Sequence, residues 1–154
     1  MKIVKIAIAA LFALALAFGV LMIFKGKRSR SMKPEVGMVD GRLKACGEKP
    51  NCVSSFAEQG TDFYYPPIEA DNIEVIWDNL NILVGDLGFK VQFSNQKYIH
   101  CTAKTKLMGF IDDIEFLLDI EAGKIYVRSA SRVGYSDLGK NRSRLDDIVN
   151  QLMK

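Results

Sequence analysis

The longest apolar stretch of the chain runs from Ile6 to Phe24 and contains no charged or polar side chain. A helix of these 19 residues, at about 1.5 Å each, is about 28 Å long, close to the hydrocarbon thickness of a bilayer. We therefore predict a transmembrane anchor over residues 1–25. The alternative is a signal peptide cleaved after Ala15-Leu16-Ala17, but the apolar run continues beyond that site, which favours an uncleaved anchor.

Residues 26–40 are predicted to form a basic linker between the membrane and a domain that spans residues 41–154. The linker lacks an apolar period and contains Pro34. After it, the chain as far as Ile68 is rich in Gly, Pro, Asn and Ser, so no long regular element is expected there. The segment from Phe63 to Ile68 is apolar and extended, and it could lie along the edge of a sheet.

Two amphipathic helices are predicted within the domain. The first has apolar residues spaced three and four apart: Ile73, Ile76, Trp77, Leu80, Leu83, Val84 and Leu87. Asp71 and Glu74 have the spacing of a capping box at its start, and Gly88 marks its end. The second helix begins at about Leu138 and has one apolar face: Leu145, Ile148, Val149 and Leu152.

Between these helices, alternating apolar positions and turn residues predict four strands. They are Phe89–Ser94, Lys97–Thr105, Phe110–Ile120 and Lys124–Val133. The order of helix, four strands and helix is typical of an α+β domain. We expect an antiparallel four-stranded sheet with two helices packed on one face, preceded by a single transmembrane helix.

The last two strands can be aligned by their apolar faces. If Ile120 faces Ile125, one face of the pair is apolar, whereas a slip of one residue would place charged side chains in the core. On the opposite face this register places Asp113 beside Arg132, with Glu115 beside Ala130 and diagonal to the arginines. Such a ladder either stabilises an exposed sheet face or orients Arg128 and Arg132 towards a carboxylate or phosphate.

Asp112 is unusual because strand alternation places it on the apolar face. A buried carboxylate needs partners, and Ser131 or the backbone and side chains of the corner at residues 134–144 could supply them. A cationic partner such as Arg142 would keep the carboxylate ionised. Alternatively, Asp112 lies beyond the end of the strand and is solvated. A carboxyl group with a raised pKa would be a candidate general acid or base.

The corner between the last strand and the last helix is dense in polar residues. Asp137 suits an N-cap that accepts hydrogen bonds from amides near Gly139, with Asn141 and Arg142 in the first helical turn. The alternative is that the exposed amides of this helix start, together with Arg142, bind an anion.

The chain carries a formal net charge of +3, but its charge is unevenly distributed. Seven of the 21 basic residues precede Glu35, and all 18 acidic residues lie at Glu35 or later. The basic collar, defined as Lys25, Lys27, Arg28, Arg30 and Lys33, suits anionic lipid, whereas a mildly acidic domain argues against binding nucleic acid. Membrane lipid is therefore the partner predicted for residues 6–24 and the collar. The collar also favours a cytoplasmic domain by the positive-inside rule.

The remaining candidate chemistry is sparse. Cys46 and Cys52 enclose a short turn-forming loop and form either a disulfide, which requires an oxidising compartment, or two free thiols. The single histidine, His100, is predicted to point away from the core. No metal-ligand spacing, nucleophile elbow, phosphate loop or dinucleotide fingerprint occurs, so no metal site, cofactor or catalytic residue is predicted.

Three ordered motifs carry a resemblance to a known family. They are Leu43–Cys46 with Pro50–Ser55, then Phe110–Phe116, and then the run from Arg128 to Arg144. Together they resemble the family of domain of unknown function 1499 (DUF1499). The resemblance implies a small, exported or membrane-tethered envelope domain and favours a Cys46–Cys52 disulfide. It implies no reaction and no catalytic residues.

From these observations we expect a single-pass protein of the bacterial inner membrane whose domain faces the periplasm and acts as a binding or scaffolding module. Its partner would be an envelope protein or a small anionic ligand. The candidate ligand-binding residues are Asp112, Asp113, Arg128, Arg132, Asp137, Asn141 and Arg142. The alternative is a hydrolase that uses Asp112 or Asp113 with Arg128 and Arg142. A third interpretation is that the motif simply locks the last helix to the sheet.

Overall fold

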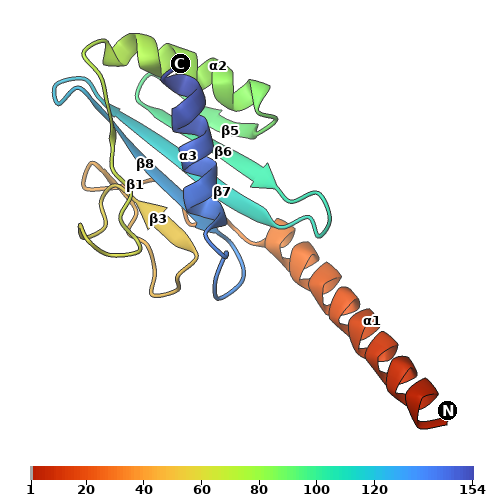
Figure 1. Ribbon diagram of the computed structural model, residues 1–154. Coiled ribbons are helices and arrows are strands. Elements are labelled where there is room, and N and C mark those ends of the chain that lie inside the picture. Colours follow the sequence, from red (N-terminus) through yellow and green to blue (C-terminus); the bar gives the residue numbers. More distant parts are fainter. Residues whose placement is uncertain (1) are drawn as a thin grey trace.

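The computed structural model describes residues 2–154 and contains one long helix that projects from an α+β domain (Figure 1). The projecting helix, α1 (Lys2–Ser31), is long and apolar enough to cross a membrane, with a mean hydropathy of 2.8 over its most apolar window. The apolar side chains of this window are not buried against the domain. A candidate membrane helix is therefore present where the apolar run predicted it.

The domain is built on an antiparallel sheet of six strands. The central strands are β6 (Tyr98–Lys104), β7 (Ile111–Asp119) and β8 (Lys124–Ser131), with β5 (Lys90–Ser94) at one edge. At the other edge, β3 (Cys52–Ser54) and β4 (Ile68–Glu69) both pair with β8. The predicted sheet of four strands is therefore wrong in number, because two short strands from the loop-rich region join it.

Two helices contribute to the core on one side of the sheet. In α3 (Lys140–Leu152), Leu145, Ile148 and Leu152 are buried over β3 and β8, and α2 (Ile73–Asp86) contacts α3, β5 and β8. The expected pair of helices on one face is thus seen only in part, since α3 lies across the sheet and α2 packs beside it and against the edge strand. Apolar residues of both helices and of the sheet form one continuous cluster.

The predicted end of α2 is confirmed, whereas the capping box predicted at its start is wrong. Gly88 has a φ of 76° just after the helix, a conformation that glycine adopts readily. The N-cap residue is Asn72, whose side chain makes no capping hydrogen bond, so the predicted capping box between Asp71 and Glu74 does not form.

The register of β7 and β8 differs by two residues from the prediction. Glu115 lies opposite Arg128, and Asp113 lies opposite Ala130 rather than Arg132. A shift of two residues leaves every side chain on its predicted face, because the side-chain period of a strand is two. The face assignments therefore hold although the predicted cross-strand partners were wrong.

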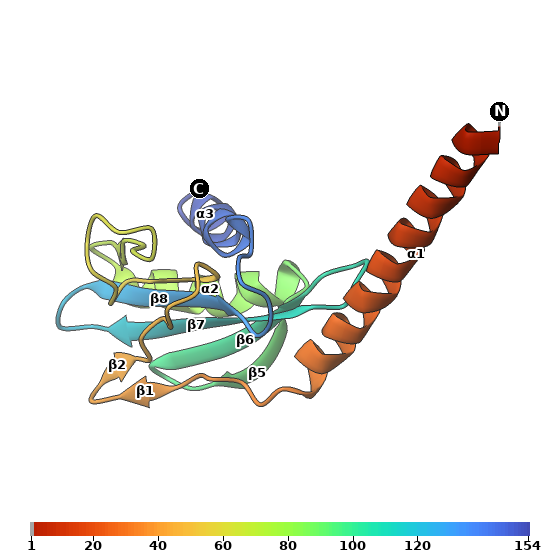
Figure 2. The same ribbon diagram turned by 90° about the horizontal axis from the view of Figure 1, so that it is seen from below.

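The face of the sheet opposite α3, here called the outer face, is also covered. The chain after α1 crosses it and forms a small hairpin of β1 (Met38–Val39) and β2 (Arg42–Leu43), which lies on the other side of the sheet from α3 (Figure 2). Leu43 packs there with Tyr98 and Leu117 in a second buried cluster. Charged side chains on the outer face are consequently buried between the sheet and this covering segment.

The segment predicted as an irregular linker is partly helical. Helix α1 includes all residues of the basic collar except Lys33 and ends at Ser31, and Gly26 and Ser29 are buried against the domain. The remaining part, from Met32 onwards, is irregular until β1 begins at Met38.

Candidate functional site

A pocket of about 430 Å³ opens on the outer face above β7 and β8. Its floor is formed by Asp113, Arg128, Ala130 and Arg132. One wall is the segment after α1, and the opposite wall is the loop closed by the disulfide; these walls contribute Met32, Lys33, Glu35, Gly47, Glu48, Lys49 and Asn51. Three segments that are distant in sequence thus enclose one polar space.

Arg132 is held at the pocket floor by a two-pronged ion pair. Its Nε and Nη2 atoms each donate to a carboxylate oxygen of Asp113 at 2.7 Å, and its Nη1 donates to the carbonyl of Met32 at 3.1 Å. The Oδ1 atom of Asp113 also lies 2.8 Å from His100 Nε2. Burial opposes ionisation of Asp113, but the hydrogen bonds and charges of Arg132 and His100 outweigh it and hold the pKa of this carboxyl below its usual range.

The second floor arginine, Arg128, pairs with a carboxylate that is fully buried. Its Nη1 donates to Glu115 Oε2 at 2.6 Å, while Glu115 Oε1 accepts from the Gly37 amide and from the Tyr98 hydroxyl. Burial, followed by the charge of Glu115 and its hydrogen bond, raises the pKa of Tyr98. Within residues 2–154, Arg128 Nε is the one buried side-chain nitrogen or oxygen without a hydrogen-bond partner.

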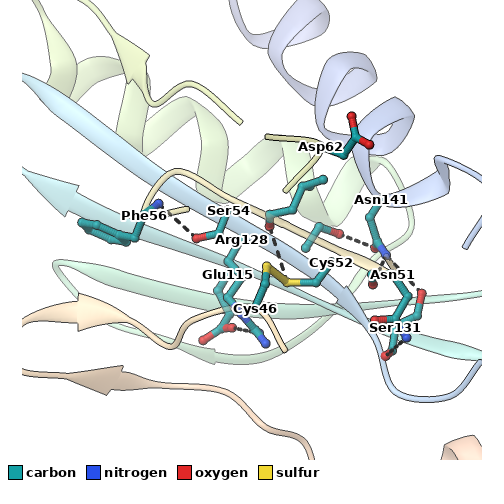
Figure 3. Close-up of a disulfide and its surroundings, with 12 residues drawn as sticks. Cys46, Asn51, Cys52, Ser54, Phe56, Asp62, Glu115, Arg128, Ser131 and Asn141 are labelled. Carbon is teal, nitrogen blue, oxygen red and sulfur yellow. Dashed lines mark hydrogen bonds and ion pairs between the residues drawn. A yellow bond between two sulfur atoms is a disulfide. The ribbon is translucent and has the colours of Figure 1, made fainter. Parts of the chain in front are cut away.

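A disulfide bond fixes the loop that forms one wall of the pocket. Cys46 and Cys52 are joined, with their Cα atoms 5.7 Å apart, and the bond lies near the Arg128–Glu115 pair (Figure 3). Cys52 is the first residue of β3, which pairs with β8 beside Arg128. Of the two interpretations of these cysteines, the structure contains the disulfide.

Asp112 lies on the face towards α3, buried as strand alternation predicted. Its Oδ2 accepts from Arg144 Nη2 at 2.6 Å. The partner therefore comes from the corner at residues 134–144, as one of the alternatives had it, but it is Arg144 and not the example Arg142. The alternative of a solvated Asp112 was wrong. Arg142 points instead to the carbonyls of Asp62 and Tyr64 and lies over the Tyr65 ring.

The corner before α3 is held together by its own side chains. The Asp137 carboxylate accepts from the amides of Gly139 and Asn141, which confirms its capping role even though the N-cap position itself is Gly139. The fully buried Asn141 side chain donates to the Asn51 carbonyl and to the Ser131 hydroxyl. These bonds tie the start of α3 to β8 and to the residue before β3.

The seven predicted site residues therefore separate into two groups. Asp113, Arg128 and Arg132 meet at the pocket floor, whereas Asp112, Asp137, Asn141 and Arg142 lie on the α3 side. His100 was predicted to be a surface side chain, but it is buried beneath the covering segment. Strand alternation had placed it on the outer face correctly; the covering segment has no periodic pattern that would reveal its position.

Other residues that line the pocket were not predicted from the sequence either. Lys33, Lys49 and Asn51 lie in irregular segments, where no periodicity indicates which side chains point inward. Over residues 2–154 no cluster of three or more His, Cys, Asp or Glu side chains has a metal-binding arrangement. What the pocket offers is a set of guanidinium, ammonium and amide donors, interspersed with carboxylates.

The fold and the pocket define a small α+β domain with a disulfide-closed wall, attached to a candidate membrane helix. The model of a family described as protein of unknown function (DUF1499) matches residues 42–152, and the chain belongs to this family. The match includes the pocket floor, the disulfide loop and α3, but it leaves out α1 and the segment with Lys33 and Glu35. No curated protein matches the chain.

Proposed function

We propose that this protein is a membrane-tethered binding domain of the cell envelope, and that the pocket above β7 and β8 binds a ligand carrying a carboxylate or phosphate group. The observation that carries the proposal is the pocket floor. Two guanidinium groups, those of Arg128 and Arg132, are fixed there by buried carboxylates at the base of a 430 Å³ space.

Each of these guanidinium groups has N–H groups that bond no protein acceptor, and of these only the Nε of Arg128 is itself buried. A guanidinium has five N–H groups. Arg132 uses three nitrogen atoms on protein acceptors, with one bond each, and Arg128 makes one such bond, to Glu115. Carboxylates and phosphates are the groups that match this planar donor geometry.

Because positive and negative side chains both line the pocket, a ligand would be recognised by the direction of its hydrogen bonds more than by its net charge. Lys33 stands near Glu35 on one wall, and Lys49 is next to Glu48 on the other. The floor arginines are likewise paired with Asp113 and Glu115. Because acids accompany the cations, a ligand gains most from well-directed hydrogen bonds, and its affinity should be modest for an isolated anion.

The hydrolase alternative has less support from the geometry. Both oxygens of Asp113 are engaged and its pKa is lowered, which makes it a weak general base near neutral pH. Asp112 is paired with Arg144 on the α3 side. Arg128 and Arg142 lie on opposite sides of the sheet, so they do not converge on one oxyanion.

We place the domain on the periplasmic side of a bacterial inner membrane. The support is the Cys46–Cys52 disulfide, because such bonds persist in oxidising compartments and are rare in the cytosol. The candidate membrane helix supplies the tether. The basic collar favours the opposite orientation by charge alone, which makes the redox state of this pair the decisive observation.

Binding can be tested on the full-length protein in nanodiscs. Thermal unfolding followed through the buried Trp77 should shift to higher temperature with added inorganic phosphate or succinate, and the shift should saturate. Sodium chloride at equal ionic strength is the control and should give no comparable shift. If neither anion exceeds chloride, the pocket is not a carboxylate or phosphate site.

A pair of variants locates the effect. Lys33→Gln with Lys49→Gln removes both wall ammonium groups from exposed positions, so the fold should persist and the anion-induced shift should fall by at least half. Lys97→Gln, an exposed lysine outside the pocket, is the matched control and should keep the full shift. An undiminished shift in the double variant would place anion binding elsewhere.

A further inference from the structure

Helix α1 is joined to the domain by a rigid contact. Its buried face meets the turn between β6 and β7, here called the β6–β7 turn (residues 105–110), and both views show this turn against α1 (Figures 1 and 2). Ser29 Oγ accepts from the Ile111 amide at 2.9 Å and donates to its carbonyl at 3.3 Å. Arg30 Nη1 donates to the Gly109 carbonyl at 3.2 Å.

The closest approach in this contact requires a glycine in the helix. A Cβ atom at Gly26 would lie 1.9 Å from the Met108 carbonyl oxygen, so no side chain fits there without displacing the turn. Next to this contact, Arg132 Nη1 also donates to the carbonyl of Met32, the residue after α1. The end of α1 and the residue after it are therefore both bonded to the domain instead of forming a flexible linker.

The β6–β7 turn is itself well ordered by internal hydrogen bonds. The Thr105 amide donates to the Phe110 carbonyl, the Gly109 amide donates to the Thr105 carbonyl, and the Phe110 amide donates to Thr105 Oγ1. At the tip of this closed turn, the Leu107 side chain is 86 % exposed. Two exposed lysines, Lys104 and Lys106, flank it.

The level of the turn tip along α1 indicates which partner contacts the exposed Leu107. Gly26, which contacts Met108, lies two residues after Phe24, the end of the apolar run, and two helical residues correspond to about 3 Å. The tip is thus held at the level where α1 leaves the hydrocarbon. An apolar side chain between lysines, next to the basic collar, suits the interface of an anionic bilayer.

We propose that the β6–β7 turn is a second membrane-binding element, with Leu107 in the interfacial layer of the bilayer that α1 enters and with Lys104 and Lys106 on anionic headgroups. The contact with α1 places the turn there. The domain is thereby held at a fixed tilt on the membrane surface, independently of what its pocket binds.

The test uses the full-length protein in vesicles of phosphatidylcholine with phosphatidylglycerol. Replacing the buried free thiol with Cys101→Ala leaves the disulfide intact and allows one labelled site. An environment-sensitive fluorophore is attached at Leu107→Cys, and the matched control is Leu138→Cys, a leucine that is 90 % exposed in the corner before α3. Lipids with a nitroxide near the headgroup should quench the label at position 107 at least threefold more than at position 138.

Two variants test how the turn reaches the bilayer. Gly26→Val should disrupt the contact with α1 and reduce quenching at position 107 to the level at position 138, while circular dichroism of the domain stays unchanged. Lys104→Gln with Lys106→Gln should abolish the increase of quenching with phosphatidylglycerol content. Equal quenching at positions 107 and 138, or quenching unaffected by Gly26→Val, would overturn the proposal.

A second copy of the chain is the competing occupant for Leu107. Nanodiscs that contain a single protein separate the two. Strong quenching at position 107 should persist in single-copy nanodiscs if lipid covers the turn. If the label becomes as water-exposed there as it is at position 138, another copy covers the turn and the lipid proposal fails.

Discussion

Replacing Arg128 with methionine should destabilise the domain severely, because it would leave a buried carboxylate without its cation. Glu115 is fully buried, and Arg128 Nη1 lies 2.6 Å from its Oε2. Removing one partner of a buried ion pair costs about 3–5 kcal/mol. We expect a loss near the lower limit, about 3 kcal/mol, because Glu115 keeps its hydrogen bonds from the Gly37 amide and the Tyr98 hydroxyl.

A double variant separates the cost of an unpaired buried charge from the cost of lost packing. Glu115→Gln combined with Arg128→Met removes both charges and leaves an amide oxygen to accept from Gly37 and Tyr98, so it should recover about half of the loss or more. Lys97→Met, which removes an exposed positive charge, is the matched control and should change stability by less than about 0.5 kcal/mol.

Denaturant unfolding of the full-length protein in detergent, followed by Trp77 fluorescence, measures these differences. Trp77 reports on the domain because it is the only tryptophan and is buried in α2. For a domain of this size, 3 kcal/mol corresponds to a fall in Tm of about 12 °C. A loss below about 1 kcal/mol for Arg128→Met, or a double variant no more stable than the single one, would refute the reasoning.

Three further predictions test other parts of the structure. Replacing Cys46 and Cys52 with serine should lower the free energy of unfolding by about 2 kcal/mol in denaturant, the chain-entropy value for so short a loop. Thiol labelling of intact and permeabilised cells, with and without reductant, should show that this pair is protected only before reduction. Asp137→Ala should cost about 1 kcal/mol of thermal stability through loss of the α3 cap. Because the folded pKa of Asp113 lies below its usual 3.8, its stabilisation is present above that pH and lost as pH falls through the folded pKa, so Asp113→Asn should flatten this part of the acid-unfolding curve.

Strand alternation predicted much of the sheet correctly. It placed Asp113, Glu115, Arg128 and Arg132 on one face and Asp112 on the other. It did not give the partners, because apolar alternation excludes a slip of one residue but is satisfied equally by a slip of two. That Glu115 lies directly opposite Arg128 is therefore known only from the structure.

The covered outer face could not be predicted. His100 alternates outward as expected, but whether an outward residue is solvated depends on what crosses it. The segment that crosses the outer face has no apolar periodicity that would reveal its position. The edge strands β3 and β4 were missed because they are only two or three residues long. The helical state of the basic collar was missed for a related reason: the collar has no apolar stripe, and it is held by contacts of Gly26, Ser29 and Arg30 with a turn about 80 residues later in the sequence.

The choice between cationic partners for Asp112 also lay beyond the sequence. Arg142 and Arg144 are both in the first two turns of α3, and the helix start determines which of them faces the sheet. Because α3 begins after Gly139 with Asn141 buried, Arg144 lies one turn further on the same face and reaches Asp112. A shift of the helix start by one residue would have changed this assignment.

The most direct test of the pocket is arginine side-chain NMR of the full-length protein in nanodiscs, titrated with inorganic phosphate and with succinate. The Nε–Hε signals of Arg128 and Arg132 should shift together and saturate, while that of Arg144, which pairs with Asp112 on the α3 side, should stay in place. Unmoved signals of Arg128 and Arg132, or an equal shift of Arg144, would contradict the proposal that the outer-face pocket is the binding site.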